Sequence, residues 1–352
     1  MSDTITQTRL SIHRKPHVLA TEVTMEERSS IIRAFDDMFS VKTIPGTLAE
    51  ATSEDRALVE ILIPFIHSKI GCAEMDMMPR LQLIATRSTG YDHIDLASTV
   101  EREIAVANVP GYGENAVAEY TFALMLTLTR KIHMASTRTQ HGDYTLEGLR
   151  GCDLYGKTLG VIGTGAIGIH VIRIAKGFGM QVLAYDVFPH RHLSEVLGFS
   201  YGGLAELLSR SDIVTLHAPA TPTTFHMLNR ETLSQMKRGA FLINTARGSL
   251  VDVQALAWAL DTGLLAGAGL DTLEGEEFLQ HEEELLHEPG AEEKLKLLVQ
   301  HHILQQRSNV VITPHIAFNT EEALRRILDT TIENVQAFSL GRPQNLVSGR
   351  SF

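Results

Sequence analysis

Short apolar runs alternate with longer amphipathic stretches along most of the chain. Four such runs fall in the first third of the chain, and six more follow after residue 158. A short β-branched run followed by a helical pattern is typical of parallel βαβ units, so the sequence predicts an α/β protein with two doubly wound parallel sheets. The predicted strands are residues 17–20, 58–63, 81–85, 104–106, 159–163, 181–186, 212–217, 240–245, 267–273 and 309–313.

Three stretches have patterns that predict helices with particular surroundings. Residues 115–135 are apolar around most of a helical circumference, which favours burial between domains or against another subunit. Apolar positions near helical spacing predict a final helix over residues 320–338, which can return to the first domain. Residues 276–307 form an acidic, helix-prone insertion, and we expect a solvated surface helix there.

The length and composition are those of a globular protein with more than one domain. The 352 residues exceed the roughly 100 to 200 residues of a single domain. The net charge of −11 is concentrated in the acidic insertion, and it disfavours a nucleic-acid partner. Two cysteines cannot form a disulfide framework, and the N-terminus lacks the apolar core of a signal peptide. Because no stretch is long and apolar enough to cross a membrane, we expect a cytoplasmic protein with no membrane partner.

Two histidine pairs raise the question of a metal site. His190 lies two residues before His192, and His301 is directly followed by His302. Neither pair has a cysteine or carboxylate ligand pattern beside it, so we predict no metal site.

Residues 151–158, GCDLYGKT, match the phosphate-loop pattern of nucleotide triphosphatases. That loop must follow a buried strand and open a helix, whose N–H groups hold the phosphates. Here a polar stretch precedes the pattern and a predicted strand follows it. The context therefore argues against a triphosphatase.

A second glycine pattern, GTGAIG at residues 163–168, lies in the context that its chemistry needs. A predicted strand precedes it, a helical pattern follows it, and the next strand ends at Asp186. Gly163 permits the turn, Gly165 lets a pyrophosphate approach the backbone, and Gly168 lets the helix pack closely on the strand. Asp186 can accept hydrogen bonds from ribose hydroxyls and would repel a 2′-phosphate. The sequence thus predicts a Rossmann-type domain that binds NAD in preference to NADP.

Three residues that follow predicted strands fit the chemistry of a nicotinamide-dependent reduction. Hydride transfer to a 2-oxo acid needs a cation for the carboxylate, a proton donor for the carbonyl oxygen and a group that keeps this donor charged. Arg247, Glu276 and His315 each come shortly after a different predicted strand. Because the carboxyl ends of parallel strands border the ligand crevice, these side chains can meet in one place.

The segments TARGSLVD, LDTLEGE and VITPHIAF, together with the glycine loop, resemble the signatures of the D-isomer-specific 2-hydroxyacid dehydrogenases. The resemblance extends from about residue 81 to residue 337 and includes STGYDHID and NVPGYGENAVAEYTFAL. It implies that Arg247 binds the substrate carboxylate and polarises the carbonyl, and that His315 is the general acid. It also implies that Glu276 pairs with His315 and stabilises the imidazolium.

The same resemblance implies which residues surround the substrate and the cofactor. Thr89 and Gly90 would offer backbone N–H groups to the substrate carboxylate, and Tyr112 and Phe318 would flank the substrate. Asp271 would lie near the carboxamide of the cofactor. The implied cofactor-binding residues are Gly163, Gly165, Ala166, Ile167, Gly168, Asp186, Ala218, Pro219, Thr224, Thr245, Ala246 and Asp271.

Some alternatives stay open at this point. Glu274 and Glu277 are neighbours of Glu276 that can take its place beside the acid. Family members that reduce glyoxylate or hydroxypyruvate commonly have Pro after the catalytic Glu, whereas Glu277 follows here, and the insertion is more similar to the lactate-type branch. We therefore expect reduction of pyruvate or a close 2-oxo acid to the D-hydroxy acid. The alternatives are a glyoxylate or hydroxypyruvate reductase and a non-catalytic, NAD-sensing protein similar to the corepressors of this family.

The resemblance also predicts a discontinuous domain plan. Residues 1–112 and 316–352 would form a flavodoxin-like substrate domain. Residues 113–315 would form the Rossmann-type NAD-binding domain, with the acidic insertion at about residues 277–307. The active site would lie in the cleft between the two domains, and the protein would be a homodimer through the nucleotide domain and the helix at 115–135.

Overall fold

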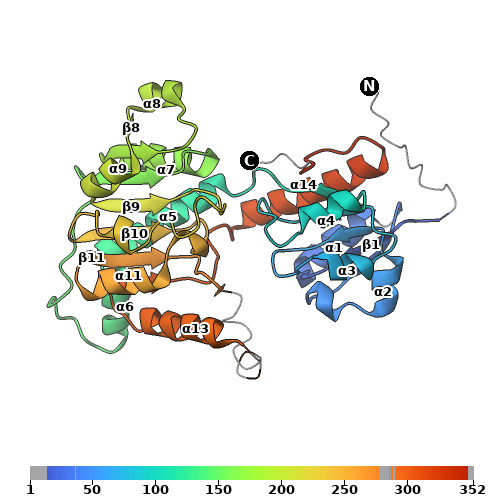
Figure 1. Cartoon of the computed structure of the whole chain (residues 1–352), viewed down its shortest axis with the longest axis horizontal. Coiled ribbons are helices and arrows are strands. Elements are labelled where there is room, and N and C mark those ends of the chain that lie inside the picture. Colours follow the sequence, from blue (N-terminus) through green and yellow to red (C-terminus); the bar gives the residue numbers. More distant parts are fainter. Residues whose placement is uncertain (1–13, 36, 277–284, 286, 288–289, 348–352) are drawn as a thin grey trace. The chain divides into compact units, whose positions relative to one another are not determined.

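The computed structural model describes residues 14–35, 37–276, 285, 287 and 290–347. The chain divides into two compact units, which we call the first and the second unit (Figure 1). The first unit is Met1–Tyr112 with Thr320–Phe352, and the second unit is Gly113–Asn319. Each unit has its own parallel sheet with helices on both faces, so the predicted α/β class is confirmed.

The return of the chain to the first unit occurs later than the sequence predicts. The first unit resumes at Thr320, whereas the prediction places its second segment from residue 316 onward. The intervening residues stay with the second unit because the backbone N–H groups of Ile316 and Ala317 donate to the carboxylate of Asp271.

The first unit is built on five parallel strands in the order β2-β1-β3-β4-β5. This is the order of the flavodoxin-like doubly wound fold. The edge strand β2 is missing from the sequence prediction because its residues, SVKT, alternate between exposed and half-buried positions and form no apolar run. The strands are β1 (His17–Ala20), β2 (Ser40–Thr43), β3 (Ile61–Ile63), β4 (Leu83–Ala85) and β5 (Ala105–Ala107).

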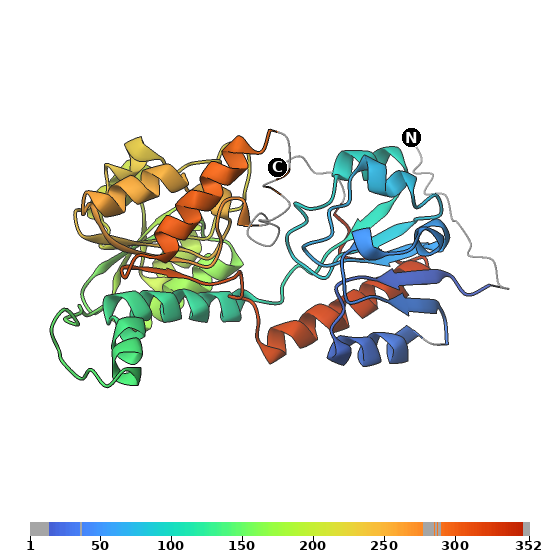
Figure 2. The ribbon, with the colours of Figure 1, turned by 90° about the horizontal axis from the view of Figure 1, so that it is seen from below.

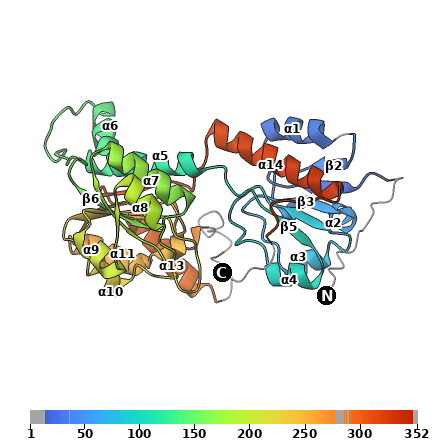
Figure 3. The ribbon, with the colours of Figure 1, turned by 90° about the horizontal axis from the view of Figure 1, so that it is seen from above.

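Helices cover both faces of the first sheet. The helices α1 and α14 lie side by side on one face, and α3 and α4 lie on the other (Figure 3). Successive side chains of β1 point to opposite faces, so Val18 packs in the cluster that contains Phe35 of α1, and Leu19 in the one that contains Met75 of α3. The helices are α1 (Met25–Phe35), α2 (Ser53–Leu58), α3 (Cys72–Asp76), α4 (Leu96–Glu101) and α14 (Glu321–Ser339).

The second unit contains a seven-stranded parallel sheet in the order β12-β11-β10-β9-β6-β7-β8. Counted from its first strand this is the dinucleotide-binding order 3-2-1-4-5-6 with one further strand at the edge. The sequence predicts six strands for this sheet, and this number is wrong. The prediction omits β8, which has two residues and no apolar run, and it counts β12 as the sixth strand. The strands are β6 (Thr158–Ile162), β7 (Gln181–Tyr185), β8 (Ser200–Tyr201), β9 (Ile213–Leu216), β10 (Ala240–Asn244), β11 (Leu265–Leu270) and β12 (Val310–Ile312).

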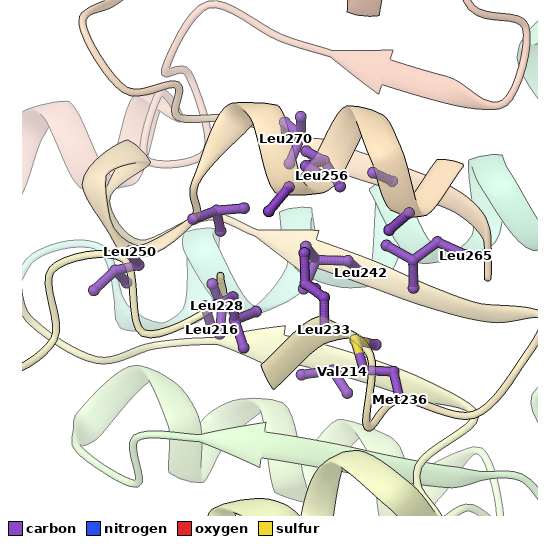
Figure 4. Close-up of a cluster of buried hydrophobic side chains, with 14 of the residues drawn as sticks. Val214, Leu216, Leu228, Leu233, Met236, Leu242, Leu250, Leu256, Leu265 and Leu270 are labelled. Carbon is purple, nitrogen blue, oxygen red and sulfur yellow. The ribbon is translucent and has the colours of Figure 1, made fainter. Parts of the chain in front are cut away.

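The core of the second unit has one layer on each face of this sheet. The helices α5 and α7 cover one face, and α9, α10, α11 and α13 cover the other. Figure 4 shows this second layer, where Leu216 and Leu242 of the sheet meet Leu233 of α10 and Leu256 of α11. The helices of this unit are α5 (Glu114–Thr129), α6 (Ile132–Gln140), α7 (Ala166–Gly177), α8 (Arg191–Leu197), α9 (Leu204–Arg210), α10 (Arg230–Leu233), α11 (Val253–Asp261) and α13 (Glu292–Gln305).

The helix predicted over residues 115–135 is in fact two helices, and α6 turns away from the axis of α5 (Figure 2). Lys131 lies between them in the left-handed region, with φ of 52°. The carbonyl of Thr129 accepts the N–H of Cys152 at 2.9 Å, so the loop before β6 takes over an acceptor at the end of α5. More than half of the residues of α5 are buried and none of α6. Among the residues described, no helix is long and apolar enough to cross a bilayer.

The acidic insertion is only partly the solvated excursion that the sequence predicts. Its helix α13 buries Leu298, His301 and Leu304, and it packs on α11 and β12. The remaining part of the prediction concerns residues 277–284, 286 and 288–289, which lie outside the described residues.

The phosphate-loop pattern at residues 151–158 lies in a turn and runs directly into β6. Gly156 has φ of 72° and its N–H donates to the carbonyl of Gly179 at 3.1 Å. Because a strand and not a helix follows the pattern, the exclusion of a phosphate loop is confirmed.

Candidate active site

The loop between β6 and α7 has the backbone geometry of a dinucleotide cradle. Gly163 has φ of 93°, and a Cβ there would lie 2.6 Å from the backbone of the segment after β9. A Cβ on Gly168 would overlap the carbonyl of Gly163, so α7 starts in close contact with the strand. Gly165 precedes the first helical residues, Ala166 and Ile167, without a side-chain cap and with open space at its Cβ position. A pyrophosphate can therefore reach the helix N-terminus, which fits these residues to NAD.

Asp186 follows β7 and lies beside this loop. Its Oδ2 accepts the N–H of Thr164 at 2.6 Å and the hydroxyl of Thr164 at 2.8 Å, and its Oδ1 accepts the N–H of Phe188 at 2.8 Å. Partial burial raises the pKa of Asp186, but these hydrogen bonds and the nearby His190 together hold the pKa below its ordinary value. Asp186 is thus a fixed anion, as recognition of ribose hydroxyls and repulsion of a 2′-phosphate require.

The segment after β9 runs beside the glycine loop. The N–H of His217 donates to the last residue of β6 at 2.7 Å, and the position of a Cβ on Gly163 lies 2.8 Å from the nitrogen of Ala218. The hydroxyl of Thr224 donates to the carbonyl of Pro219 at 2.7 Å, which closes the turn. The structure therefore brings the predicted cofactor segment to the glycine loop, and it uses the Thr224 side chain inside the turn.

His217, at the end of β9, gives the second unit an acid-sensitive group. Its Nε2 lies 3.0 Å from the hydroxyl of Thr215, and its Nδ1 is buried with no hydrogen-bond partner among the described residues. Burial lowers the pKa of His217 from 6.5 to about 3. Because this pKa is lower in the folded chain than in the unfolded chain, the unfolded chain binds the proton first. The stabilisation by neutral His217 is complete above about pH 6.5 and is lost as the pH falls toward 3.

We expect the substitution His217→Asn to reduce the acid sensitivity of unfolding. Between pH 7.5 and pH 5 the wild-type chain should lose about 1–2 kcal/mol more free energy of unfolding than the variant. This follows from roughly 1.36 kcal/mol per pH unit below about 6.5, reduced because His217 is partly exposed to solvent. Urea unfolding of both proteins at both pH values measures this difference. Equal losses in the two proteins would contradict the assignment.

The loop after β10 is shaped by a buried side chain that the sequence predictions do not include. The Oδ1 of Asn244 accepts the N–H of Ala246 at 3.0 Å, and its Nδ2 donates to the carbonyl of Arg247 at 2.9 Å. The hydroxyl of Thr245 lies 3.0 Å from that of Thr121 on α5. Asn244 therefore sets the backbone from which Arg247 projects. The sequence did carry a signal for this role, because Asn244 is a polar residue at the end of an apolar strand, directly before the segment that contains Arg247.

The loop that carries Arg247 is in direct contact with the loop after β11. A Cβ on Gly248 would overlap the backbone of Leu273 and Glu274. Only glycine permits this approach, which brings the backbone of Arg247 close to the turn that leads to Glu276.

His315 occupies the left-handed region with φ of 54°, which is strained for a residue other than glycine. Its N–H donates to the carbonyl of Asp271 at 2.9 Å and to that of Thr313 at 3.0 Å. The buried carboxylate of Asp271 accepts the Thr313 hydroxyl at 2.6 Å and the N–H groups of Ile316 and Ala317 at 3.0 and 2.8 Å. In this structure Asp271, which the sequence assigns to the cofactor, fixes the loop that carries His315.

His315 and Glu276 form a hydrogen-bonded pair, with 2.6 Å between Nδ1 and Oε1. Glu274 instead contacts His226, with 2.8 Å between Oε1 and Nε2, and Glu277 lies outside the described residues. Of the two described glutamates, only Glu276 therefore lies at His315. Because Nδ1 of His315 is bound to Glu276 and both side chains are partly exposed, Nε2 is the ring nitrogen that can exchange a proton with a ligand.

The residues predicted to bind substrate belong to both units. In the first unit, Thr89 and Gly90 follow β4, and their backbone N–H groups make no hydrogen bond to another described residue. Tyr112 is the last residue of that unit before the chain enters the second. In the second unit, the ring of Phe318 lies edge-on to the imidazole of His315, with 6.4 Å between the ring centroids.

Comparison with known proteins gives one consistent family. Residues 122–317 match the family model of the D-isomer specific 2-hydroxyacid dehydrogenase, NAD binding domain. A 2-hydroxyacid dehydrogenase homolog of Haemophilus influenzae is 40% identical over 309 residues, 86% of this chain and 90% of that protein. The D-lactate dehydrogenase of Escherichia coli is 40% identical over 316 residues, 88% of this chain and 93% of that protein.

A solved structure adds a similarity of fold. The crystal structure of D-lactate dehydrogenase from Aquifex aeolicus, complexed with NAD and lactic acid, is 37% identical in sequence and superposes with a TM-score of 0.86. The match covers 95% of this chain and 100% of that chain. The chain therefore belongs to the D-isomer-specific 2-hydroxyacid dehydrogenases, and it is an NAD-dependent oxidoreductase.

Proposed function

We propose that this enzyme reduces pyruvate or a close 2-oxo acid to the D-2-hydroxy acid, with NADH as the reductant. The observation that carries the proposal is the hydrogen-bonded pair of His315 and Glu276, in which His315 lies in a strained loop at the carboxyl end of the sheet. The similarity to D-lactate dehydrogenases over most of the chain supports pyruvate as the substrate.

In the proposed reaction, His315 donates a proton from Nε2 to the carbonyl oxygen of the substrate. The carboxylate of Glu276 accepts a hydrogen bond from Nδ1, so it keeps Nδ1 protonated and stabilises the imidazolium. Arg247 binds the carboxylate and polarises the carbonyl, which suits the two parallel donors of a guanidinium. NADH, when bound at the glycine loop, supplies the hydride to the carbonyl carbon.

The first unit is proposed to complete the recognition of substrate. Thr89 and Gly90 would donate their backbone N–H groups to the carboxylate, and Tyr112, with Phe318 of the second unit, would contact the substrate side chain.

The homodimer stays a prediction, which light scattering of the purified chain would test.

The proposal is tested by NADH oxidation with pyruvate, 2-oxobutyrate, phenylpyruvate, hydroxypyruvate and glyoxylate, followed by chiral analysis of the product. A pyruvate optimum with D-lactate as product is the expected result. A glyoxylate or hydroxypyruvate optimum would replace the proposed substrate and leave the proposed roles standing. Tight NADH binding without turnover of any of these acids would contradict the proposal and favour an NAD-sensing protein.

The two glutamates of the loop after β11 offer a matched pair of variants. Glu276→Gln keeps the shape of the side chain but removes the charge beside His315, so kcat for reduction should fall by about 10- to 100-fold, as for a hydrogen bond to a charged group. Glu274→Gln loses only the contact with His226, and its kcat should stay within about threefold of wild type. Similar losses in both variants would argue against a specific role for Glu276.

A further inference from the structure

A chain of hydrogen bonds links the edge of the second sheet to Asp186. Tyr201 lies on the edge strand β8, whose Cα register pairs it with Ala184 of β7, two residues before Asp186. Its hydroxyl donates to the hydroxyl of Thr164 at 2.9 Å, and the Thr164 hydroxyl donates to Oδ2 of Asp186 at 2.8 Å. The Tyr201 hydroxyl in turn accepts the N–H of His190 at 3.1 Å.

The direction of each bond in this chain is fixed by the chemistry of its members. An ionised carboxylate only accepts hydrogen bonds, so Thr164 must donate its single hydroxyl hydrogen to Asp186. Thr164 can then only accept from Tyr201, and Tyr201 can only accept from the backbone N–H of His190. All hydrogens therefore point toward the carboxylate, an arrangement in which each bond polarises the next.

The position of Thr164 makes this chain relevant to the cofactor. Thr164 is the second residue of the glycine loop, it is 1% exposed, and its backbone N–H also donates to Oδ2 at 2.6 Å. Asp186 Oδ2 thus receives two hydrogen bonds and Oδ1 receives one, from Phe188. Acceptor capacity remains on Oδ1, where a ribose hydroxyl can bind.

We propose that Tyr201 and Thr164 are positioning residues that set the preference of this dehydrogenase for NAD over NADP by holding the Asp186 carboxylate in one orientation. A fixed carboxylate accepts ribose hydroxyls without first being ordered, and it cannot turn away from a 2′-phosphate. Without the Tyr201 hydroxyl, the Thr164 hydroxyl loses the donor that polarises its bond to Asp186, so the Asp186 carboxylate is held less firmly. Affinity for NADH then falls while the repulsion of NADPH weakens.

The test measures the dissociation constants of NADH and NADPH by fluorescence titration of the full chain in the absence of substrate. Asp186→Ala sets the reference, because it should abolish most of the preference for NADH. Tyr201→Phe should narrow the ratio of the two constants by about 3- to 10-fold, and Thr164→Val by about tenfold or more. Thr164→Ser keeps the hydroxyl and should stay within about twofold of wild type. Tyr155→Phe, an exposed tyrosine on the same unit, should leave the ratio unchanged.

A double-mutant cycle separates positioning from a merely structural role. In the Asp186→Ala background, Tyr201→Phe should produce no further change in the ratio, because its effect passes through Asp186. A wild-type ratio in Tyr201→Phe, an equal loss of affinity for both cofactors, or the same change with and without Asp186 would overturn the proposal. Circular dichroism confirms that each variant is folded, and if Tyr201→Phe does not fold, the comparison of Thr164→Ser with Thr164→Val decides the question. Neither measurement depends on which 2-oxo acid the enzyme reduces.

Discussion

Replacing His315 with alanine should lower kcat for reduction of the preferred 2-oxo acid by about 10²- to 10⁴-fold, the usual contribution of a positioned general acid. The dissociation constant of NADH should change little, because the glycine loop and Asp186 follow other strands of the sheet, β6 and β7. The physical reason is that His315, held by Glu276, is the group proposed to give a proton to the carbonyl oxygen. Steady-state kinetics and fluorescence titration of NADH measure the two quantities separately.

His226 provides a matched control for this substitution. Like His315, it has a positive φ, 47° against 54°, and it contacts a glutamate of the loop after β11. His226→Ala removes a similar contact from the same loop, so a purely structural effect would appear in both variants. We expect kcat of His226→Ala to stay within about threefold of wild type. An equal fall in kcat and in NADH affinity in His315→Ala would show that His315 is not the acid.

The pH profile tests the same role in the wild-type enzyme. Reduction of the 2-oxo acid consumes a proton, so kcat/KM for this direction should decline with rising pH if a general acid supplies that proton. Oxidation of the D-hydroxy acid releases a proton and should show the opposite dependence on pH. A flat profile in both directions would count against His315.

The elements that sequence predicts well are those whose residues satisfy a local backbone requirement. The glycine loop is an example: Gly163 has a positive φ, and a Cβ on Gly168 would overlap a backbone carbonyl, so the turn requires glycine at both positions. The strand β8 is the opposite case. Its two residues carry no apolar run, because an edge strand buries little, although Tyr201 makes the hydrogen bond that reaches Thr164.

Within the site, the sequence identifies residue types but not their tertiary partners. Spacing does not distinguish Glu274 from Glu276, because Gly275 between them has φ of 68° and redirects the chain. The two carboxylates consequently contact different histidines, which lie far apart in the sequence. Asp271 likewise contacts a loop more than forty residues away, and no local pattern records such a contact.

Arg247→Lys should lower kcat/KM for pyruvate by about 10²- to 10³-fold, although the positive charge is kept. A loss of this size is comparable to that caused by removing one preorganised donor at a developing oxyanion. A guanidinium presents two parallel donors to a carboxylate, whereas an ammonium is a point charge on a flexible stem. Asn244 and Gly248 fix the backbone on both sides of Arg247, so the side chain projects from a rigid turn. The loop therefore cannot move to bring the shorter side chain of lysine to the same place. The measurement is kcat/KM for pyruvate beside the dissociation constant of NADH, which should remain near the wild-type value.

The fork geometry of Arg247 can be separated from its charge by chemical rescue. Arg247→Ala should be nearly inactive, and added guanidinium at concentrations well below those that unfold the chain should restore part of the activity, because the free ion can occupy the same place with the same planar donors. Ammonium at equal ionic strength should restore much less, since it lacks the second parallel donor. If Arg247→Lys retained wild-type kcat/KM, or if both ions rescued Arg247→Ala equally, Arg247 would act only as a positive charge and bidentate binding of the substrate would be wrong.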